Sequence, residues 1–168
     1  KMQNILNERG FGESEKDTLI LNSFETLYLL YNNKLELKKV NKNIIFDELI
    51  QKYIQKNDDI LTRFLLYRDL RTKGYVVKDG FGFDSDFRVY EKGTYGQKDA
   101  KFLIFAFNEG TQQKIGKLYK NIHEITQMGK EPIIAVIERR GEIIYYKINK
   151  MNFLENKSEL EMKDFNFN

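Results

Sequence analysis

Several residue types are missing or rare in this chain, and each shortage excludes a class of protein. The sequence has no cysteine, which excludes disulfide bonds and thiolate metal sites. It has a single histidine, His123, so a histidine-rich metal site is excluded as well. No apolar run approaches the length of a membrane-spanning helix, and no signal peptide is recognisable. We therefore expect a cytoplasmic protein that uses no metal or other cofactor and does not enter a membrane.

The composition that remains is that of a folded domain. The chain has 168 residues, of which 41% are hydrophobic and 32% charged, enough for one ordinary domain or two small ones. Its formal net charge is +3, and the segment 154–168 holds more acidic than basic residues, so the rest of the chain is somewhat more basic. This balance mildly favours a partner that carries phosphate.

The first third of the chain predicts a small α/β domain. Apolar residues recur at helical spacing in residues 24–31 and again in 46–54, and Ser23 is a suitable N-cap for the first helix. Short strands are expected at residues 18–21 and 35–37. The polar run Asn57-Asp58-Asp59 caps a third helix, and we place the domain boundary there, so that residues 1–58 form the N-terminal domain.

The next segment predicts a helix, a sharp stop and a hairpin. A helical stripe from Ile60 ends at Gly74, where a C-terminal cap needs positive φ. A strand follows at residues 75–77. Asp79-Gly80 predicts a type I′ turn, because both central residues of that turn need positive φ. The second strand, residues 86–90, alternates its side chains between two faces.

The rest of the chain predicts a sheet with a long helix. Residues 102–107 and 133–137 are apolar on both faces, which is typical of central strands covered on both sides. Between them a helix is expected to open at Gly110-Thr111 and to end at Gly129. A turn at residues 139–141 leads into a last strand. Residues 59–153 should therefore form a C-terminal mixed-sheet domain with flanking helices, followed by a charged tail, 154–168, and the fold class is α+β (mixed α/β).

A dense motif runs through the middle of the chain. It reads YRDLRTKG at residues 67–74, then a phenylalanine-glycine stretch, then DFRVY at residues 86–90. This pattern resembles the C-terminal domain of the archaeal tRNA-splicing endonuclease (tRNA-intron endonuclease) family, and the resemblance covers roughly residues 2–153. It implies a metal-independent endoribonuclease fold. That family cleaves precursor tRNA at a bulge-helix-bulge with a Tyr, a His and a Lys, leaving 2′,3′-cyclic phosphate and 5′-hydroxyl ends.

The resemblance implies two catalytic positions and a departure at a third. The family tyrosine ends the DFRVY motif at Tyr90, and the family lysine, five residues before an alanine of the following strand, corresponds to Lys130. At the histidine position this chain has Asp99. A carboxyl group in water has lost its proton at neutral pH, so it cannot serve readily as a general acid. Without the resemblance, a strand-end tyrosine indicates packing and a lysine after a helix indicates dipole stabilisation.

Two further features suit assembly with a second chain. The last strand is apolar for an exposed edge, and such edges pair with other chains. In the family the corresponding strand pairs across a dimer, and the charged hairpin before it reaches a partner's pocket; an ordinary solvated turn is the alternative for that hairpin. The expected interface residues are Glu138, Arg139, Arg140, Glu142, Ile144, Tyr145 and Tyr146.

We therefore expect a structural, non-catalytic subunit of a heteromeric tRNA-splicing endonuclease, which supports a catalytic partner on precursor tRNA in a heterotetramer with two copies of each chain. Alone, the chain should be inactive. One alternative is an active metal-independent endoribonuclease with Asp99 in place of the histidine. Another is an RNA- or protein-binding module of the same fold.

Overall fold

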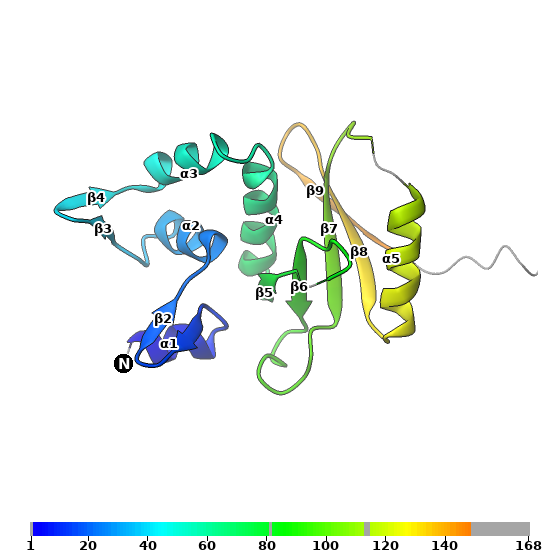
Figure 1. Cartoon of the computed structure of the whole chain (residues 1–168), viewed down its shortest axis with the longest axis horizontal. Coiled ribbons are helices and arrows are strands. Elements are labelled where there is room, and N and C mark those ends of the chain that lie inside the picture. The colour runs from blue at the N-terminus through cyan, green and yellow to red at the C-terminus, as the bar shows by residue number, and fades with distance from the viewer. Residues whose placement is uncertain (1, 81, 113–114, 149–168) are drawn as a thin grey trace, which may run out of the picture.

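Helix α4 (Ile60–Thr72) lies between a group of small N-terminal elements and a five-stranded sheet (Figure 1). The structure is a computed structural model, and it describes residues 2–80, 82–112 and 115–148. Three helices and two short hairpins precede α4 in these residues. They are α1 (Met2–Glu8), β1 (Glu13–Glu15), β2 (Thr18–Ile20), α2 (Ser23–Tyr31), β3 (Leu37–Lys39), β4 (Lys42–Ile44) and α3 (Phe46–Ile54).

The large sheet has the strand order β5-β6-β7-β8-β9, and only its β7–β8 pair is parallel. A parallel pair needs a crossover connection, which helix α5 (Ile115–Gln127) supplies. Two short strands and β9 flank the two long central ones. The bounds are β5 (Val76–Asp79), β6 (Phe87–Tyr90), β7 (Phe102–Asn108), β8 (Glu131–Ile137) and β9 (Ile143–Lys147).

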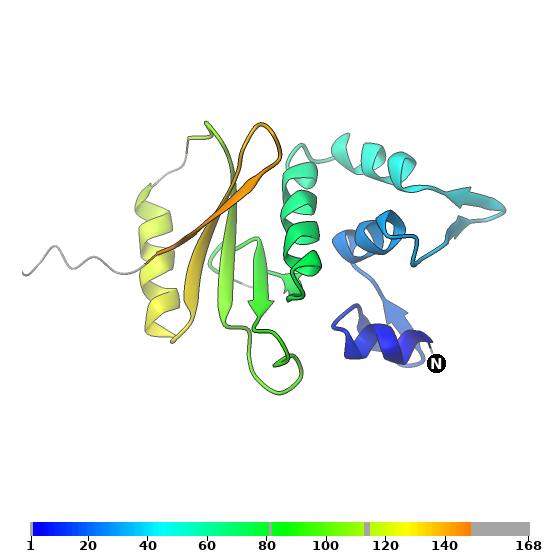
Figure 2. The same cartoon turned by 180° about the vertical axis from the view of Figure 1, so that it is seen from behind.

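The two faces of the sheet carry two separate apolar clusters. Helix α4 covers one face, where Phe87, Val89 and Ile104 are buried, and α5 covers the other, where Leu103 and Phe105 pack with Ile125 of the helix (Figure 2). Strands β7 and β8 lie inside the sheet and are apolar toward both helices. The predicted central strands and the mixed α+β fold are confirmed. None of the helices in the described parts of the chain is long and apolar enough to cross a bilayer.

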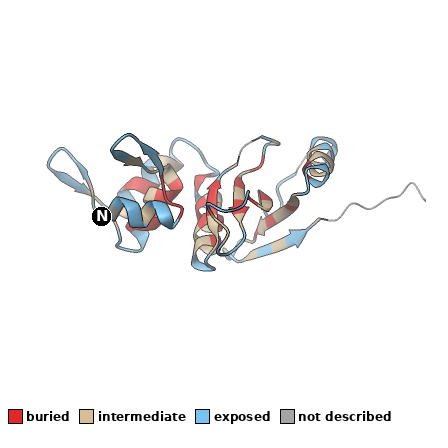
Figure 3. Ribbon diagram, turned by 90° about the horizontal axis from the view of Figure 1, so that it is seen from below, coloured by how far each residue is buried: buried red, intermediate tan, exposed pale blue. Residues whose placement is uncertain are grey.

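The α4-side cluster continues into the N-terminal elements. The ring of Phe24 in α2 meets Phe87 of the sheet edge-on at 5.2 Å between centroids, and it also stacks with Tyr67 of α4. Burial is therefore concentrated around α2 and α4 (Figure 3). Residues on both sides of position 58 belong to this one cluster. The predicted domain boundary at residue 58 stays a prediction.

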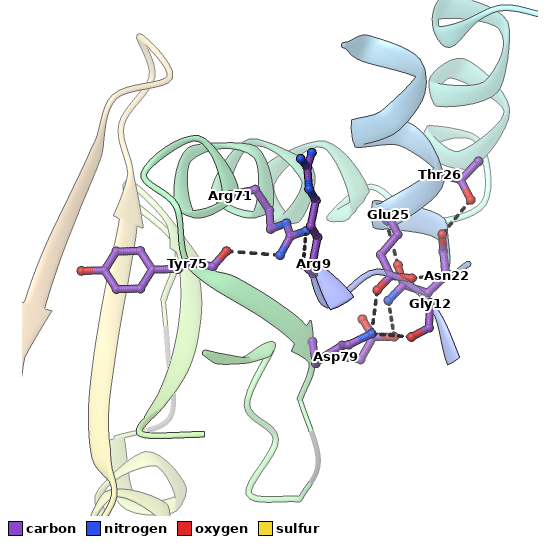
Figure 4. Close-up of polar contacts among 9 residues, drawn as sticks. Arg9, Gly12, Asn22, Glu25, Thr26, Arg71, Tyr75 and Asp79 are labelled. Carbon is purple, nitrogen blue, oxygen red and sulfur yellow. Dashed lines mark hydrogen bonds and ion pairs between the residues drawn. The ribbon is translucent and has the colours of Figure 1, made fainter. Parts of the chain in front are cut away.

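Polar contacts join the same two parts of the chain (Figure 4). The Nζ of Lys78 in β5 donates to Oε1 of Glu25 in α2 at 3.0 Å and to the backbone oxygen of Gly12 at 2.8 Å. Beside them, Asn22 donates to Asp79 at 3.3 Å. On the other side, the guanidinium of Arg71 donates to the backbone oxygen of Arg9 at 3.0 Å.

The predicted type I′ turn at Asp79-Gly80 is wrong. Strand β5 ends at Asp79 and β6 begins at Phe87, so the connection is much longer than two residues. Gly80 does not have positive φ. Its small size serves another purpose, because a Cβ atom there would lie 1.8 Å from the backbone oxygen of Ser85. The loop is closed by the Gly80 N–H, which donates to Asp86 at 2.9 Å.

Several element ends also differ from the prediction. The N-cap of α2 is Asn22, because its side chain accepts from the Glu25 N–H and the Glu25 carboxylate accepts in return, a capping box that leaves Ser23 as the first helical residue. The strand expected at 35–37 begins only at Leu37. Residues 111 and 112 are not helical, so the expected opening of α5 at Gly110-Thr111 is wrong. The predicted tail lies outside the described residues.

Candidate functional site

A pocket of about 690 Å³ opens on the α5 side of the sheet. It lies between the end of β6, the loop that follows it, and α5. The residues expected at the catalytic positions all line it, although they come from three separate parts of the chain. The lining residues are Gly82, Phe83, Asp84, Arg88, Tyr90, Asp99, Ala100, Leu103, Asn121, Glu124, Met128 and Lys130.

Tyr90 reaches the pocket because of strand alternation. Phe87 and Val89 are buried toward α4, so Arg88 and Tyr90 project from the opposite face of β6. The Tyr90 ring meets the ring of Tyr95 edge-on, with centroids 4.9 Å apart and an interplanar angle of 86°. Tyr95 belongs to the loop after β6, and burial raises the pKa of its hydroxyl. This contact orients Tyr90 beside the pocket.

Lys130 lies at the junction of α5 and β8. Gly129 ends the helix with φ +72°, and the Lys130 N–H donates back to Ile125 at 3.2 Å. The Lys130 Nζ donates to the backbone oxygen of Ala100 at 2.7 Å. This hydrogen bond holds the ammonium group next to residue 99, at the start of the neighbouring parallel strand β7.

Asp99, which stands where the family has its catalytic histidine, lines the same pocket. It is exposed, while the next residue, Ala100, is buried. No residue in the described parts of the chain forms a hydrogen bond or ion pair with the Asp99 carboxylate. The imidazole of His123 does not take its place. On α5, Asn121, Glu124 and Met128 line the pocket, whereas His123 lies on another side of the helix and is half-buried there.

The acidic residues around the pocket are partly neutralised from outside it. Asp84 pairs with Lys117 at 2.5 Å, and the hydrogen bond from that ammonium lowers the pKa of the Asp84 carboxyl. Glu124 pairs with Lys120 at 3.8 Å. The charged lining residues that form no ion pair within the described residues are Arg88, Lys130 and Asp99, and Arg88 also borders a second pocket beside Glu13, Glu15 and Asp79. Such a set can hold an anion, but it contains no imidazole, the side chain that both takes up and gives back a proton near neutral pH.

Arg88 is a charged pocket residue that the sequence analysis did not assign to the site, and further lining residues such as Asn121 and Glu124 were not assigned to it either. Its Nε is buried and has no hydrogen-bond partner among the described residues. The signal was present in the DFRVY motif, because alternation places residue 88 on the same face as Tyr90. Among the described residues no cluster of three or more His, Asp or Glu side chains is arranged to hold a metal ion.

The expected interface residues lie on the hairpin that leads to edge strand β9. The Glu138 N–H donates to Glu142 at 2.9 Å and closes the hairpin, and the exposed Arg139 and Arg140 form its tip. Ile144 and Tyr146 are 40% and 51% exposed, on one face of β9.

Tyr145 lies on the opposite face of β9 from Ile144 and Tyr146. Its hydroxyl donates to Oδ2 of Asp69 in α4 at 2.5 Å, and Lys73 lies over its ring. Burial, together with this hydrogen bond, raises the pKa of Tyr145. Tyr145 is therefore engaged within the chain, and Ile144 and Tyr146 supply the apolar surface of the edge.

Comparison with known proteins agrees with this architecture. The family model described as the tRNA intron endonuclease, catalytic C-terminal domain matches residues 60–145, and that of the N-terminal domain matches residues 1–50. The chain is 32% identical to a tRNA-splicing endonuclease of Methanococcus maripaludis, over 85% of this chain and 81% of the relative. It is 31% identical to one of Methanococcus vannielii over the same shares, and 30% identical to one of Thermococcus onnurineus over 89% and 86%. The chain belongs to the tRNA intron endonuclease family.

Proposed function

We propose that this chain is a structural subunit of a heteromeric tRNA-splicing endonuclease, and that it supports a catalytic partner in cleaving bulge-helix-bulge precursor tRNA. The observation that carries the proposal is the pocket with Tyr90 and Lys130, in which a carboxylate, Asp99, takes the third position. The assembly would contain two copies of each chain, and the partner would supply the complete set of catalytic groups.

RNA cleavage requires proton transfers that an aspartate in place of the histidine cannot readily perform. A general base must remove the proton of the 2′-hydroxyl, and a general acid must protonate the departing 5′-oxygen. An ionised carboxylate has no proton to give and adds negative charge beside a phosphate that is already anionic. Loss of one acid–base group lowers a rate by roughly 10²- to 10⁴-fold. Lys130 alone can stabilise charge on the phosphate but cannot replace both transfers.

The edge of the sheet supports a role in assembly. Strand β9 is the last strand of the sheet order, and its outward face carries exposed Ile144 and Tyr146. An edge strand presents unpaired backbone groups that a second chain can pair with. The hairpin tip, with Arg139 and Arg140, would reach an acidic surface of the partner. These features favour a scaffold over an isolated enzyme.

The test compares the chain alone with the chain mixed with a catalytic tRNA-splicing endonuclease subunit, on a labelled bulge-helix-bulge RNA. We expect no cleavage by the pure chain and cleavage by the mixture at two sites per substrate. The same mixture with an Asp99→Asn chain should cleave equally well, because Asp99 takes no part in the partner's chemistry. Robust cleavage by the pure chain would defeat the proposal.

One arrangement favours a second candidate, an active endoribonuclease that uses Asp99. Tyr90, Asp99 and Lys130 do line one pocket, and the Asp99 carboxylate is free to accept and return a proton. A protonated Asp99 would then act as general acid, so the rate of the pure chain would rise as the pH falls, and Asp99→Asn would abolish it. A flat pH profile excludes this candidate.

A further inference from the structure

One of the two N-terminal hairpins of this chain is strongly basic. Residues 34–44, which contain β3, β4 and the turn between them, have four lysines and one glutamate, a net charge as large as the +3 of the whole chain. The other hairpin, β1–β2, has the same strand lengths and the same two-residue turn. It is acidic, with Glu13, Glu15 and Asp17 against Lys16. Only the β3–β4 hairpin therefore suits a polyanion.

The β3–β4 hairpin extends away from the rest of the fold (Figures 1 and 3). At its base Leu37 and Ile44 pack against the core, but every residue from 38 to 43 is exposed. Lys42 pairs with Glu48 of α3 at 3.0 Å, and Lys38 lies 3.9 Å from Glu36; both contacts are at the surface and leave the ammonium groups open to solvent. The tip is thus accessible from both faces.

Two features of the hairpin oppose its own stability. Lys39 and Lys42 are directly opposite each other across the strand pair, and like charges in that arrangement are destabilising. The turn places Val40 at φ +56°, a left-handed conformation that a β-branched residue adopts only under strain. Val40 is also 90% exposed, so burial does not compensate this strain. Unfavourable local features such as this repulsion and this backbone strain are expected at sites that serve binding.

We propose that the β3–β4 hairpin is a contact site for the sugar-phosphate backbone of helical RNA. A phosphate near Lys39 and Lys42 would convert their mutual repulsion into attraction, with Lys38 on the opposite face reaching a second phosphate. The Val40 side chain at the tip would then lie against sugars in the wide, shallow minor groove of A-form RNA. The contact reads backbone charge and shape, so it gives affinity and orientation without sequence preference.

This inference rests on the proposed function in one respect, because precursor tRNA supplies the RNA. It deepens that function by placing substrate contact on the N-terminal half, far along the chain from the pocket. Its test does not need the catalytic partner. RNA binding by the purified full chain reports on the hairpin, whereas cleavage by the mixed subunits reports on the proposed function, so either can fail alone.

The experiment measures binding of the full chain to a labelled bulge-helix-bulge RNA and to a fully paired RNA duplex, at several salt concentrations. The test variant carries Lys38→Gln, Lys39→Gln and Lys42→Gln. The control carries Lys16→Gln, Lys52→Gln and Lys56→Gln, which are exposed lysines elsewhere in the N-terminal half and which lower the net charge equally. The hairpin variant should weaken binding to both RNAs by about 10- to 100-fold, and the slope of log affinity against log salt should fall by about 2 to 3. The control should change little.

The hairpin variant should fold, because its substitutions remove the repulsive Lys39–Lys42 pair along with two ion pairs that are exposed at the surface and therefore contribute little to stability. A second variant, Val40→Gly, relieves the turn strain, so its melting temperature should rise by about 2–4 °C while RNA affinity falls. Equal RNA binding by the hairpin and control variants would overturn the proposal. A hairpin variant that binds RNA normally but no longer joins the catalytic subunit would also overturn it, in favour of an acidic protein surface as the partner.

Discussion

Glu25 of α2 and Lys78 of β5 form a buried ion pair, 3.0 Å between Oε1 and Nζ, that joins the N-terminal elements to the sheet. The two side chains are 1% and 6% exposed. The Lys78 Nζ also donates to Gly12, and the second oxygen of Glu25 accepts the Asn22 N–H of the capping box. Both oxygens of the carboxylate and two of the three ammonium hydrogens therefore have partners, and such added hydrogen bonds are what allow two charges to be buried.

Breaking one side of this pair should be costly. Lys78→Met leaves an uncompensated carboxylate in the core, and we expect a loss of about 3–5 kcal/mol in the free energy of unfolding, measured by urea titration. Glu25→Gln should cost less, because an amide keeps the capping contact. Combining Lys78→Met with Glu25→Leu should recover part of the loss. If the losses in the free energy of unfolding caused by Lys78→Met and Glu25→Leu simply add in the double variant, the two residues are not paired.

The buried Tyr67 and the half-buried Tyr145 should respond oppositely to removal of their hydroxyl groups. The Tyr67 hydroxyl is buried and has no hydrogen-bond partner among the described residues, whereas that of Tyr145 donates to Asp69. Tyr67→Phe should therefore raise the free energy of unfolding by about 1 kcal/mol, and Tyr145→Phe should lower it by about 1 kcal/mol. Each variant controls for the other, since both remove one oxygen. Equal changes in the two variants would refute this assignment.

The same tyrosines predict how stability depends on high pH. Burial raises the pKa of both Tyr67 and Tyr145. In the unfolded chain these phenols ionise near pH 10, so their contribution is fully present below pH 10 and is lost as the pH rises further. The free energy of unfolding should fall between pH 10 and 11, and the double Phe variant should show a shallower fall. Parallel profiles for the two proteins would count against the prediction.

The loop between β5 and β6 should not tolerate a side chain at its entrance. Gly80→Ala places a methyl group against the Ser85 backbone, so we expect a loss of roughly 2–3 kcal/mol in the free energy of unfolding. Gly82→Ala is the matched control, because that residue has φ +74° and open space around it, and its cost should be about 1 kcal/mol. The prediction fails if the two variants melt at the same temperature.

The exposed face of β9 should decide association with a catalytic subunit. Ile144→Lys with Tyr146→Lys should abolish co-purification with that subunit, because two charges cannot be buried in an apolar contact. The melting temperature of the isolated chain should change by no more than a few degrees. Tyr119→Lys is the control, since Tyr119 is 60% exposed on α5, away from this edge. Loss of association in the control, or its survival in the double variant, would contradict the proposed interface.

The sequence by itself determined helices α2 to α5, the central strands and the family, because helical spacing, apolar runs and the DFRVY motif are local patterns. It did not predict helix α1. The resemblance to the family singled out Tyr90, Asp99 and Lys130 as its catalytic positions, and their roles stay a prediction. Only the tertiary structure decided that these three side chains line one pocket, since the crossover through α5 brings Lys130 beside the start of β7. The sequence did not predict the long connection between β5 and β6. Close contact between Gly80 and Ser85, which no local turn preference signals, determines the conformation at its ends. Strand alternation separates Tyr145 from its neighbours, but the position of α4 decided which face of β9 is buried.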